Sequence, residues 1–303
     1  MKISSLLEDY KKYLAMSKDL DRLYLSDISL APASLLPSLY FAEFKSIDLI
    51  LPREINARNR LRRILCLSGE ELLHNEFPFI RFPIDDDEEN KAHLLSMIDH
   101  LIWKLLFDKE EEYEQYGGVN TFRYVLGEIL SNVDQNSEAK VGYTYTQPYS
   151  KRKFIDIGIL DNGITIPGKY EKSRPEFENK DVNPYEFKDD CEALYKAING
   201  ISTKEGFKRA MEGISSYEDI YLNDWIGYGL NTSIKLITEG LGGSFLIASR
   251  GGICYLTKNK KKFIKTKGEN ILNGTFVCTR FKRAKLKKDF IDYIDYSPID
   301  GPF

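Results

Sequence analysis

The sequence predicts an α/β protein in two parts, a smaller N-terminal α/β domain over residues 1–116 and a larger C-terminal two-layer α/β sandwich over residues 117–283. Segments with apolar residues at helical spacing alternate with short strand-like segments, which is typical of this class. The acidic stretch 109–115 and the pair Gly117-Gly118 interrupt the pattern and indicate a boundary. With 303 residues, of which 42% are hydrophobic, the chain can form two ordinary domains or one large one.

The N-terminal part is predicted to alternate strands with helices. Pro32 favours the start of a helix and Pro52 the end of a strand, because proline fixes its own backbone angle and lacks an amide hydrogen. Strands are expected at 22–28, 46–51 and 79–84, and helices at 31–44, 56–67 and 91–108.

The C-terminal part is predicted to begin with a helix at 120–137 whose apolar residues form one face. The continuous apolar strand at 153–160 is expected to be central in a sheet. Segment 164–226 is predicted to be a functional lid, since long irregular segments in compact domains usually carry function. Further strands are expected at 140–146, 244–249, 253–257 and 275–282, further helices at 189–199, 204–211 and 230–239, and a tail at 284–303.

Charge and cysteine content argue against several classes of protein. The formal net charge of −3 provides no global basic field for nucleic acid or anionic lipid. The four cysteines are scattered without CxxC spacing, so neither a disulfide framework nor a zinc site is predicted. The N-terminus has no signal-peptide pattern, and the chain has no apolar stretch of membrane-spanning length. We therefore expect a cytoplasmic protein with free thiols and no membrane association.

Three polar residues of the helix at 120–137 form a stripe on the shoulder of its apolar face. Glu128, Asn132 and Asn136 follow one another at intervals of four, which places them on one side of a helix. Such a stripe can border a pocket whose floor is the protein core. Taken alone, the spacing more often marks a solvated helix flank.

An aspartate ends the continuous apolar strand and is followed by Asn162-Gly163. The carboxylate of Asp161 can accept a hydrogen bond from a purine amino group, and Gly163 leaves room for a base beside the backbone. The same three residues also favour a simple turn at the end of a strand.

Two further glycine motifs follow in the chain. Gly227-Tyr-Gly229-Leu230 precedes a predicted helix, where backbone amides can converge on an anion. Gly274-Thr275 stands at the start of the last predicted strand. The order of all these motifs is far more specific than any one of them.

Together the motifs resemble those of the GHKL ATPases, whose histidine kinase-like ATPase domain has the Bergerat ATP-binding fold with a mixed sheet. This superfamily includes gyrase B subunits, the ninety-kilodalton chaperones, MutL, sensor histidine kinases and anti-sigma serine kinases. The resemblance covers residues 118–283. Residues 128–132 match the N box, 161–163 the G1 box, 227–230 the G2 box and 274–275 the late Gly-Thr. Residues 193–204 resemble the lid of small bacterial proteins of this type, and the N-terminal part resembles a STAS domain.

The resemblance implies ATP as the ligand and Mg²⁺ as its metal ion. Glu128 would act as the general base, and Asn132 would bind Mg²⁺ together with the phosphates. Asp161 would hold the adenine amino group, with Thr275 nearby through water. The remaining nucleotide contacts would come from Asn136, Gly163, Lys204, Gly227, Gly229 and Leu230.

Two positions depart from the family pattern. Thr165 stands where the G1 box usually has a second glycine, and its branched side chain restricts the backbone. We expect lid movement or nucleotide affinity to differ from those of relatives. Val133-Asp134 follows Asn132 in place of the usual alanine, which is a milder change.

The motifs favour a small regulatory ATPase, or a serine/threonine kinase of the anti-sigma type, that acts on a protein partner. A classical histidine kinase is not predicted, because His100 lacks the sequence context of a phosphoacceptor and is expected to be a partly buried helix residue. A small ATPase with a mobile lid usually reports its state to a partner.

Two other classes stay open. Lysines interleaved with aromatic residues at 258–288 favour a nucleic-acid-associated ATPase or binding module, although such a run is also typical of a solvated loop. A degenerate interaction domain without nucleotide is the third class. The presence of the charged site residues argues against it.

Overall fold

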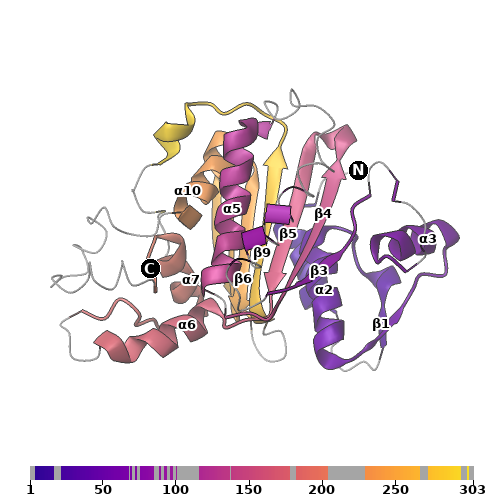
Figure 1. Cartoon of the computed structure of the whole chain (residues 1–303), viewed down its shortest axis with the longest axis horizontal. Helices are drawn as coiled ribbons and strands as arrows, with labels where there is room; N and C mark the ends of the chain where they lie inside the picture. Colours follow the sequence, from indigo (N-terminus) through magenta and orange to yellow (C-terminus); the bar gives the residue numbers. More distant parts are fainter. Residues whose placement is uncertain are drawn as a thin grey trace.

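A seven-stranded sheet forms the centre of the molecule in the order β3-β4-β5-β9-β6-β7-β8, and all of its neighbouring strands are antiparallel. Helices cover both of its faces (Figure 1). The predicted α/β class is confirmed, whereas the sheet is antiparallel where a mixed sheet was expected. The computed structural model describes residues 4–16, 22–67, 69, 72–73, 76–84, 89, 92–93, 96–97, 100, 116–136, 138–177, 182–203, 229–266, 272–294 and 299.

The predicted strands of the C-terminal part are all present, and one further strand joins them. β5 lies next to the middle of the sheet and all of its residues are buried, as its apolar sequence predicts. β8 was not predicted, because its lysines resemble a solvated loop; lysines on an exposed edge strand discourage pairing with another sheet. The bounds are β3 (Ile80–Pro83), β4 (Val141–Tyr149), β5 (Phe154–Asp161), β6 (Ser244–Arg250), β7 (Gly252–Thr257), β8 (Lys260–Lys265) and β9 (Leu272–Lys282).

One face of the sheet is covered by α5 (Gly118–Asn136), α7 (Asp190–Ile198) and α10 (Gly229–Lys235), which continues into the π-helical turn η6 (Leu236–Gly240). The apolar face of α5 packs on inward residues of β5, β6 and β9 because its apolar positions recur at helical spacing. Its buried residues are Phe122, Val125, Leu126, Ile129, Leu130 and Val133.

The opposite face is covered by α1 (Leu6–Leu14) and α2 (Pro32–Lys45). Gly158 in β5 permits the close approach of α2, since a Cβ there would lie 3.1 Å from side-chain atoms of both Pro32 and Leu36. Residues on both sides of the predicted boundary near 117 therefore share one core, and β3 belongs to the large sheet.

A small N-terminal group of elements extends this core, since Leu23, Leu61 and Ile64 belong to the same buried cluster. β1 (Arg22–Tyr24) and β2 (Asp48–Ile50) pair in parallel, with η1 (Leu25–Asp27) and α2 between them in the chain, and α3 (Ile55–Ile64) follows. In Figure 1 these elements gather at one end of the view and α6 (Ile166–Ser173) and α7 at the other. The remaining short helices are η3 (Ser150–Arg152), η4 (Arg174–Phe177) and η8 (Phe290–Tyr293).

Several sequence predictions fall on other parts of the chain. The predicted helix at 204–211 and most of the one at 91–108 lie outside the described residues. His100 is described and is exposed, which corrects the expectation of a partly buried side chain. All four cysteines are free thiols, as predicted. Within the described ranges, no helix combines the length and the apolar character needed to cross a bilayer.

A buried ion pair joins β5 to β9 at the end of the sheet remote from Asp161. Asp156 is fully buried and faces Arg280 across the strand pair, and each of two guanidinium nitrogens donates to one carboxylate oxygen at 2.7 Å. Arg280 also donates to the Ser4 carbonyl at 2.9 Å and lies over the Phe154 ring. Arg280 therefore connects the segment just before α1 to the sheet.

We expect Arg280→Met to lower the free energy of unfolding by about 3–5 kcal/mol, because it leaves a buried carboxylate without its partner. Arg81→Met is the matched control. Arg81 pairs with Glu43, but both side chains are about half exposed, so its loss should cost at most about 1 kcal/mol. Denaturant unfolding of both variants measures the difference. Equal losses would show that burial does not set the contribution of these pairs.

Candidate functional site

One cavity is lined by residues from all of the predicted motifs. It lies between the α5 side of the sheet, α10 and the segment that contains α6 and α7. Elements that lie far apart in the sequence thus bring together most of the predicted site. The predicted site residues in its wall are Glu128, Asn132, Asp161, Gly229, Leu230 and Thr275.

Two rows of side chains on the central strands form the floor and one edge of the cavity. Ile159, Val277 and Ile247 face one another across β5, β9 and β6, and all three line the cavity. Two residues further along, the same strands carry Asp161, Thr275 and Ser249 in register. Because side chains alternate between sheet faces, both rows lie on one face. The cavity therefore has a flat apolar floor bordered by a polar row.

The carboxyl group of Asp161 is almost completely buried, with 3% of the residue exposed. Burial raises its pKa to about 7, because the charged form loses its hydration. Hydrogen bonds from backbone groups of Gly163 and Thr275 act in the opposite direction. The Gly163 amide donates to Oδ1 at 2.9 Å. The group is therefore close to its midpoint of titration at neutral pH.

Gly274 allows β9 to approach the end of β5. Its φ of +141° is a backbone angle that favours glycine, and a Cβ there would lie 1.9 Å from the Asp161 carbonyl oxygen. This close approach explains why glycine precedes Thr275.

Gly229 has a similar role at the start of α10. A Cβ on this residue would lie 1.8 Å from a carboxylate oxygen of Glu128. The carboxylate of the predicted general base therefore lies directly against the first residue of α10. Asn132, one turn further along α5, lines the same cavity.

Thr165, which departs from the family pattern, begins α6. Its hydroxyl accepts a hydrogen bond from the Gly168 amide at 3.1 Å, and Pro167 occupies the first turn. A threonine cap followed by proline is a typical helix start. This signal is present in the sequence, but the segment was predicted to be irregular. Asn162 has a comparable local role, since its side chain accepts from the Lys140 and Val141 amides.

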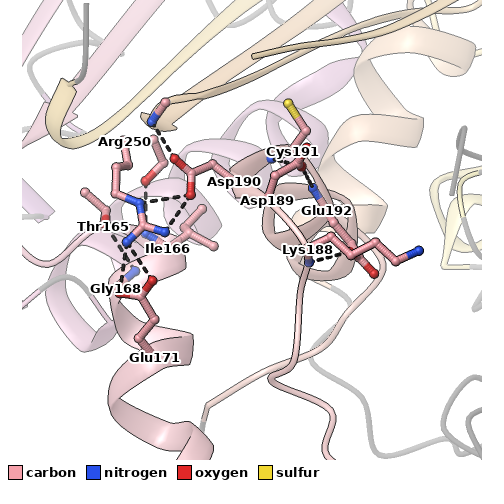
Figure 2. A network of polar contacts seen from close by, with 12 residues as sticks. Thr165, Ile166, Gly168, Glu171, Lys188, Asp189, Asp190, Cys191, Glu192 and Arg250 are labelled. Carbon is pink, nitrogen blue, oxygen red and sulfur yellow. Dashed lines mark hydrogen bonds and ion pairs between the residues drawn. The ribbon is translucent and has the colours of Figure 1, made fainter. Parts of the chain in front are cut away.

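The last two residues of β6 contact α6 and α7, which belong to the described part of the predicted lid. Ser249 is fully buried; its hydroxyl accepts from the Ile166 amide at 2.9 Å and lies 2.9 Å from the Thr275 hydroxyl oxygen. Next to it, Arg250 donates to Glu171 of α6 and to Asp190 of α7 (Figure 2). Both helices are therefore fixed to one strand end. Ser249 and Arg250 were not among the predicted site residues.

The same segment supplies the outer wall of the cavity. Tyr170 of α6 lines the cavity and donates to the Ile201 carbonyl at 2.6 Å. Lys169, the preceding residue, also lines the cavity and was missed because α6 was not predicted. The small core of this segment consists of Tyr170, Phe177, Val182, Tyr185, Ala193 and Ile201.

Other predicted residues lie elsewhere or outside the described structure. Gly163 contacts Asp161 but does not form part of the cavity wall. Lys204, Gly227 and the side chain of Asn136 lie outside the described residues. Four lysines of the alternative nucleic-acid region, Lys260, Lys261, Lys262 and Lys265, are exposed on β8, where an edge strand accounts for them without a ligand.

The described residues contain no group of three or more His, Cys, Asp or Glu side chains that could hold a metal ion. Glu128 and Asn132 of α5 line the cavity, and the carboxylate of Glu128 lies against α10. An Mg²⁺ ion here would depend on ligand phosphates and waters for most of its oxygens, which is how this ion is usually bound with nucleotides. The donor set fits such a shared ion.

Comparison with known proteins gives no match to a protein-family model and no match to a curated protein.

We expect Gly274→Ala to destabilise the protein by about 1–3 kcal/mol, because the added methyl group would meet the backbone carbonyl of Asp161, which cannot move aside as a side chain can. Gly127→Ala is the matched control on α5, since a Cβ there meets no atom within 4 Å. It should stabilise the helix by roughly 0.5–1 kcal/mol. Denaturant unfolding compares the two, and a neutral Gly274→Ala would contradict the close approach of β9 to the Asp161 carbonyl.

Proposed function

We propose that the chain binds ATP with Mg²⁺ in this cavity and uses hydrolysis or phosphotransfer as a regulatory switch on a protein partner. The observation that carries the proposal is the convergence of Glu128, Asn132, Asp161, Gly229 and Thr275 on one cavity wall. These residues come from four separate parts of the chain. Their order matches the motifs of the GHKL ATPases.

The sheet end of the cavity has the chemistry for an adenine base. The apolar row of Ile159, Val277 and Ile247 offers a flat surface for an aromatic ring. At its border, the ionised Asp161 carboxylate accepts hydrogen bonds, and the Thr275 hydroxyl can donate one. An amino group beside a ring nitrogen, as in adenine, presents the complementary pair.

The α10 end of the cavity suits the phosphates and the reaction. The oxygen of the Asn132 amide would take one position in the shell of Mg²⁺, and the ion would neutralise phosphate charge. Glu128 would accept a proton from the attacking water or hydroxyl as that oxygen bonds to the γ-phosphorus. The bond to the bridging oxygen then breaks, and ADP leaves with the electron pair.

The switch is supported by the way the outer wall is attached. α6 and α7 form part of the cavity wall, and Ser249 and Arg250 fix them to the end of β6. A ligand that contacts Thr275 would act on the same hydrogen-bonded group that holds α6. A change in the ligand could thereby alter a surface that a protein partner reads.

Calorimetric titration with ATP tests the proposal directly. We expect saturable binding that strengthens with Mg²⁺, and we expect Asn132→Ala to remove most of the Mg²⁺ dependence. Glu128→Ala should keep ATP binding within a few-fold and lower turnover by roughly 10²–10⁴-fold, the usual contribution of a general base. A wild-type protein that does not bind ATP would overturn the proposed function. Unchanged turnover in Glu128→Ala would overturn the assignment of the base alone.

The pH dependence of adenosine binding tests the role of Asp161. Adenosine is the probe because it does not titrate near neutral pH, unlike ATP. The amino group of the base needs the ionised carboxylate, whose pKa is about 7 in the ligand-free site. We therefore expect affinity to rise with pH through 7, and to be roughly tenfold lower at about pH 6 than at about pH 8. A flat profile in calorimetry would contradict this contact.

A further inference from the structure

Lys169 is the one cationic side chain among the described residues that line the cavity. It lies in the first turn of α6, and 21% of its side chain is exposed. Its ammonium group is 2.7 Å from a carboxylate oxygen of Glu138, which lies just beyond the end of α5. The pair therefore connects α6, which forms part of the cavity wall, to the chain that follows α5.

Glu138 is held by two lysines. Lys172, three residues after Lys169 on α6, donates to both carboxylate oxygens of Glu138 at 2.9 Å. Lys172 does not line the cavity, and 61% of its side chain is exposed. The hydrogen bond from Lys169 lowers the pKa of Glu138 most, and the hydrogen bonds from Lys172 lower it further. This carboxylate is therefore ionised at neutral pH.

A nucleoside triphosphate in this cavity would need a cation that can move to its phosphates. Glu128 and Asp161 give the described wall two carboxyl groups, and a nucleoside triphosphate brings further negative charge. A lysine is a point charge on a flexible stem, and an ion pair with a carboxylate that is 43% exposed is weak. Lys169 can therefore leave Glu138 at little cost. Glu138 stays paired because Lys172 remains.

We propose that Lys169 binds a phosphate group of the nucleotide, and that Glu138 holds this lysine when the cavity is empty. The inference rests on the proposed ATP site and adds a residue to it. It also gives Glu138 and Lys172 distinct functions: Glu138 competes with the ligand for Lys169, and Lys172 neutralises Glu138 after the exchange.

Titration of variants with ATP, ADP and adenosine isolates the phosphate contact. Lys169→Gln should weaken ATP binding roughly tenfold, because ATP loses a hydrogen bond between its phosphates and a charged group. It should leave adenosine binding within about twofold, because adenosine has no phosphate to make that bond. Lys172→Gln, on the same helix and with the same partner, should leave adenosine binding unchanged and weaken ATP binding only about two- to threefold, because Glu138 then has no second lysine when Lys169 leaves. Glu138→Gln should strengthen ATP binding by up to about fivefold, because it releases Lys169. Lys169→Arg should keep the preference for ATP over adenosine.

The outcomes separate this inference from the proposed function. Wild-type protein that binds neither ATP nor adenosine would overturn the ATP site itself. Wild-type binding with equal losses for ATP and adenosine in Lys169→Gln would overturn the phosphate contact and indicate a structural role. Unchanged ATP binding in that variant would overturn it as well. If Lys169→Gln does not fold, Glu138→Gln still decides, because unchanged or weaker ATP binding in it contradicts the competition.

Discussion

β5 and β9 pair in a register that sets Asp161 opposite Thr275, and the geometry of the whole site depends on that register. Gly274 makes it possible, because any side chain at this position would meet the carbonyl oxygen of Asp161. With the register fixed, the alternation of side chains brings Ile159 and Val277 under the same cavity. A slip of one residue would move both rows to the face covered by α2. The site is thus a consequence of one strand pair and one glycine.

The burial of Asp161 costs the folded protein stability when its carboxyl group is ionised. Burial raises its pKa from an ordinary 3.8 to about 7, so its folded-state pKa lies above its unfolded-state pKa. With respect to this group, the protein is therefore most stable below the unfolded-state pKa of 3.8, where the carboxyl group is protonated in both states. It loses this stability as the pH rises through about 7. A ligand that donates a hydrogen bond to the carboxylate would offset this loss. Destabilised titratable groups of this kind gather at functional sites more often than elsewhere.

The sequence predicted local structure well and non-local pairing less well. α5, β5, β6 and β7 follow from apolar periodicity, and the cavity wall contains six of the predicted site residues. The position of β3 in the large sheet and the antiparallel direction of its strands depend on contacts between distant segments, which periodicity does not encode. The sequence does not predict α6 although Thr165 and Pro167 mark its start, because the prolines and polar residues around it favour a loop. Lys169 was missed with it.

Ser249 and Arg250 show how a site residue can act through its neighbour. Consecutive residues of a regular strand point to opposite faces of the sheet. β6 ends at Arg250, however, and Arg250 has a left-handed φ of 53°, so this alternation does not continue there. This turn of the backbone lets Arg250 reach α6 and α7 while Ser249 stays behind Thr275. One strand end therefore fixes both the polar edge of the cavity and its outer wall. A ligand bound at Thr275 would therefore lie next to the two residues, Ser249 and Arg250, that hold both helices.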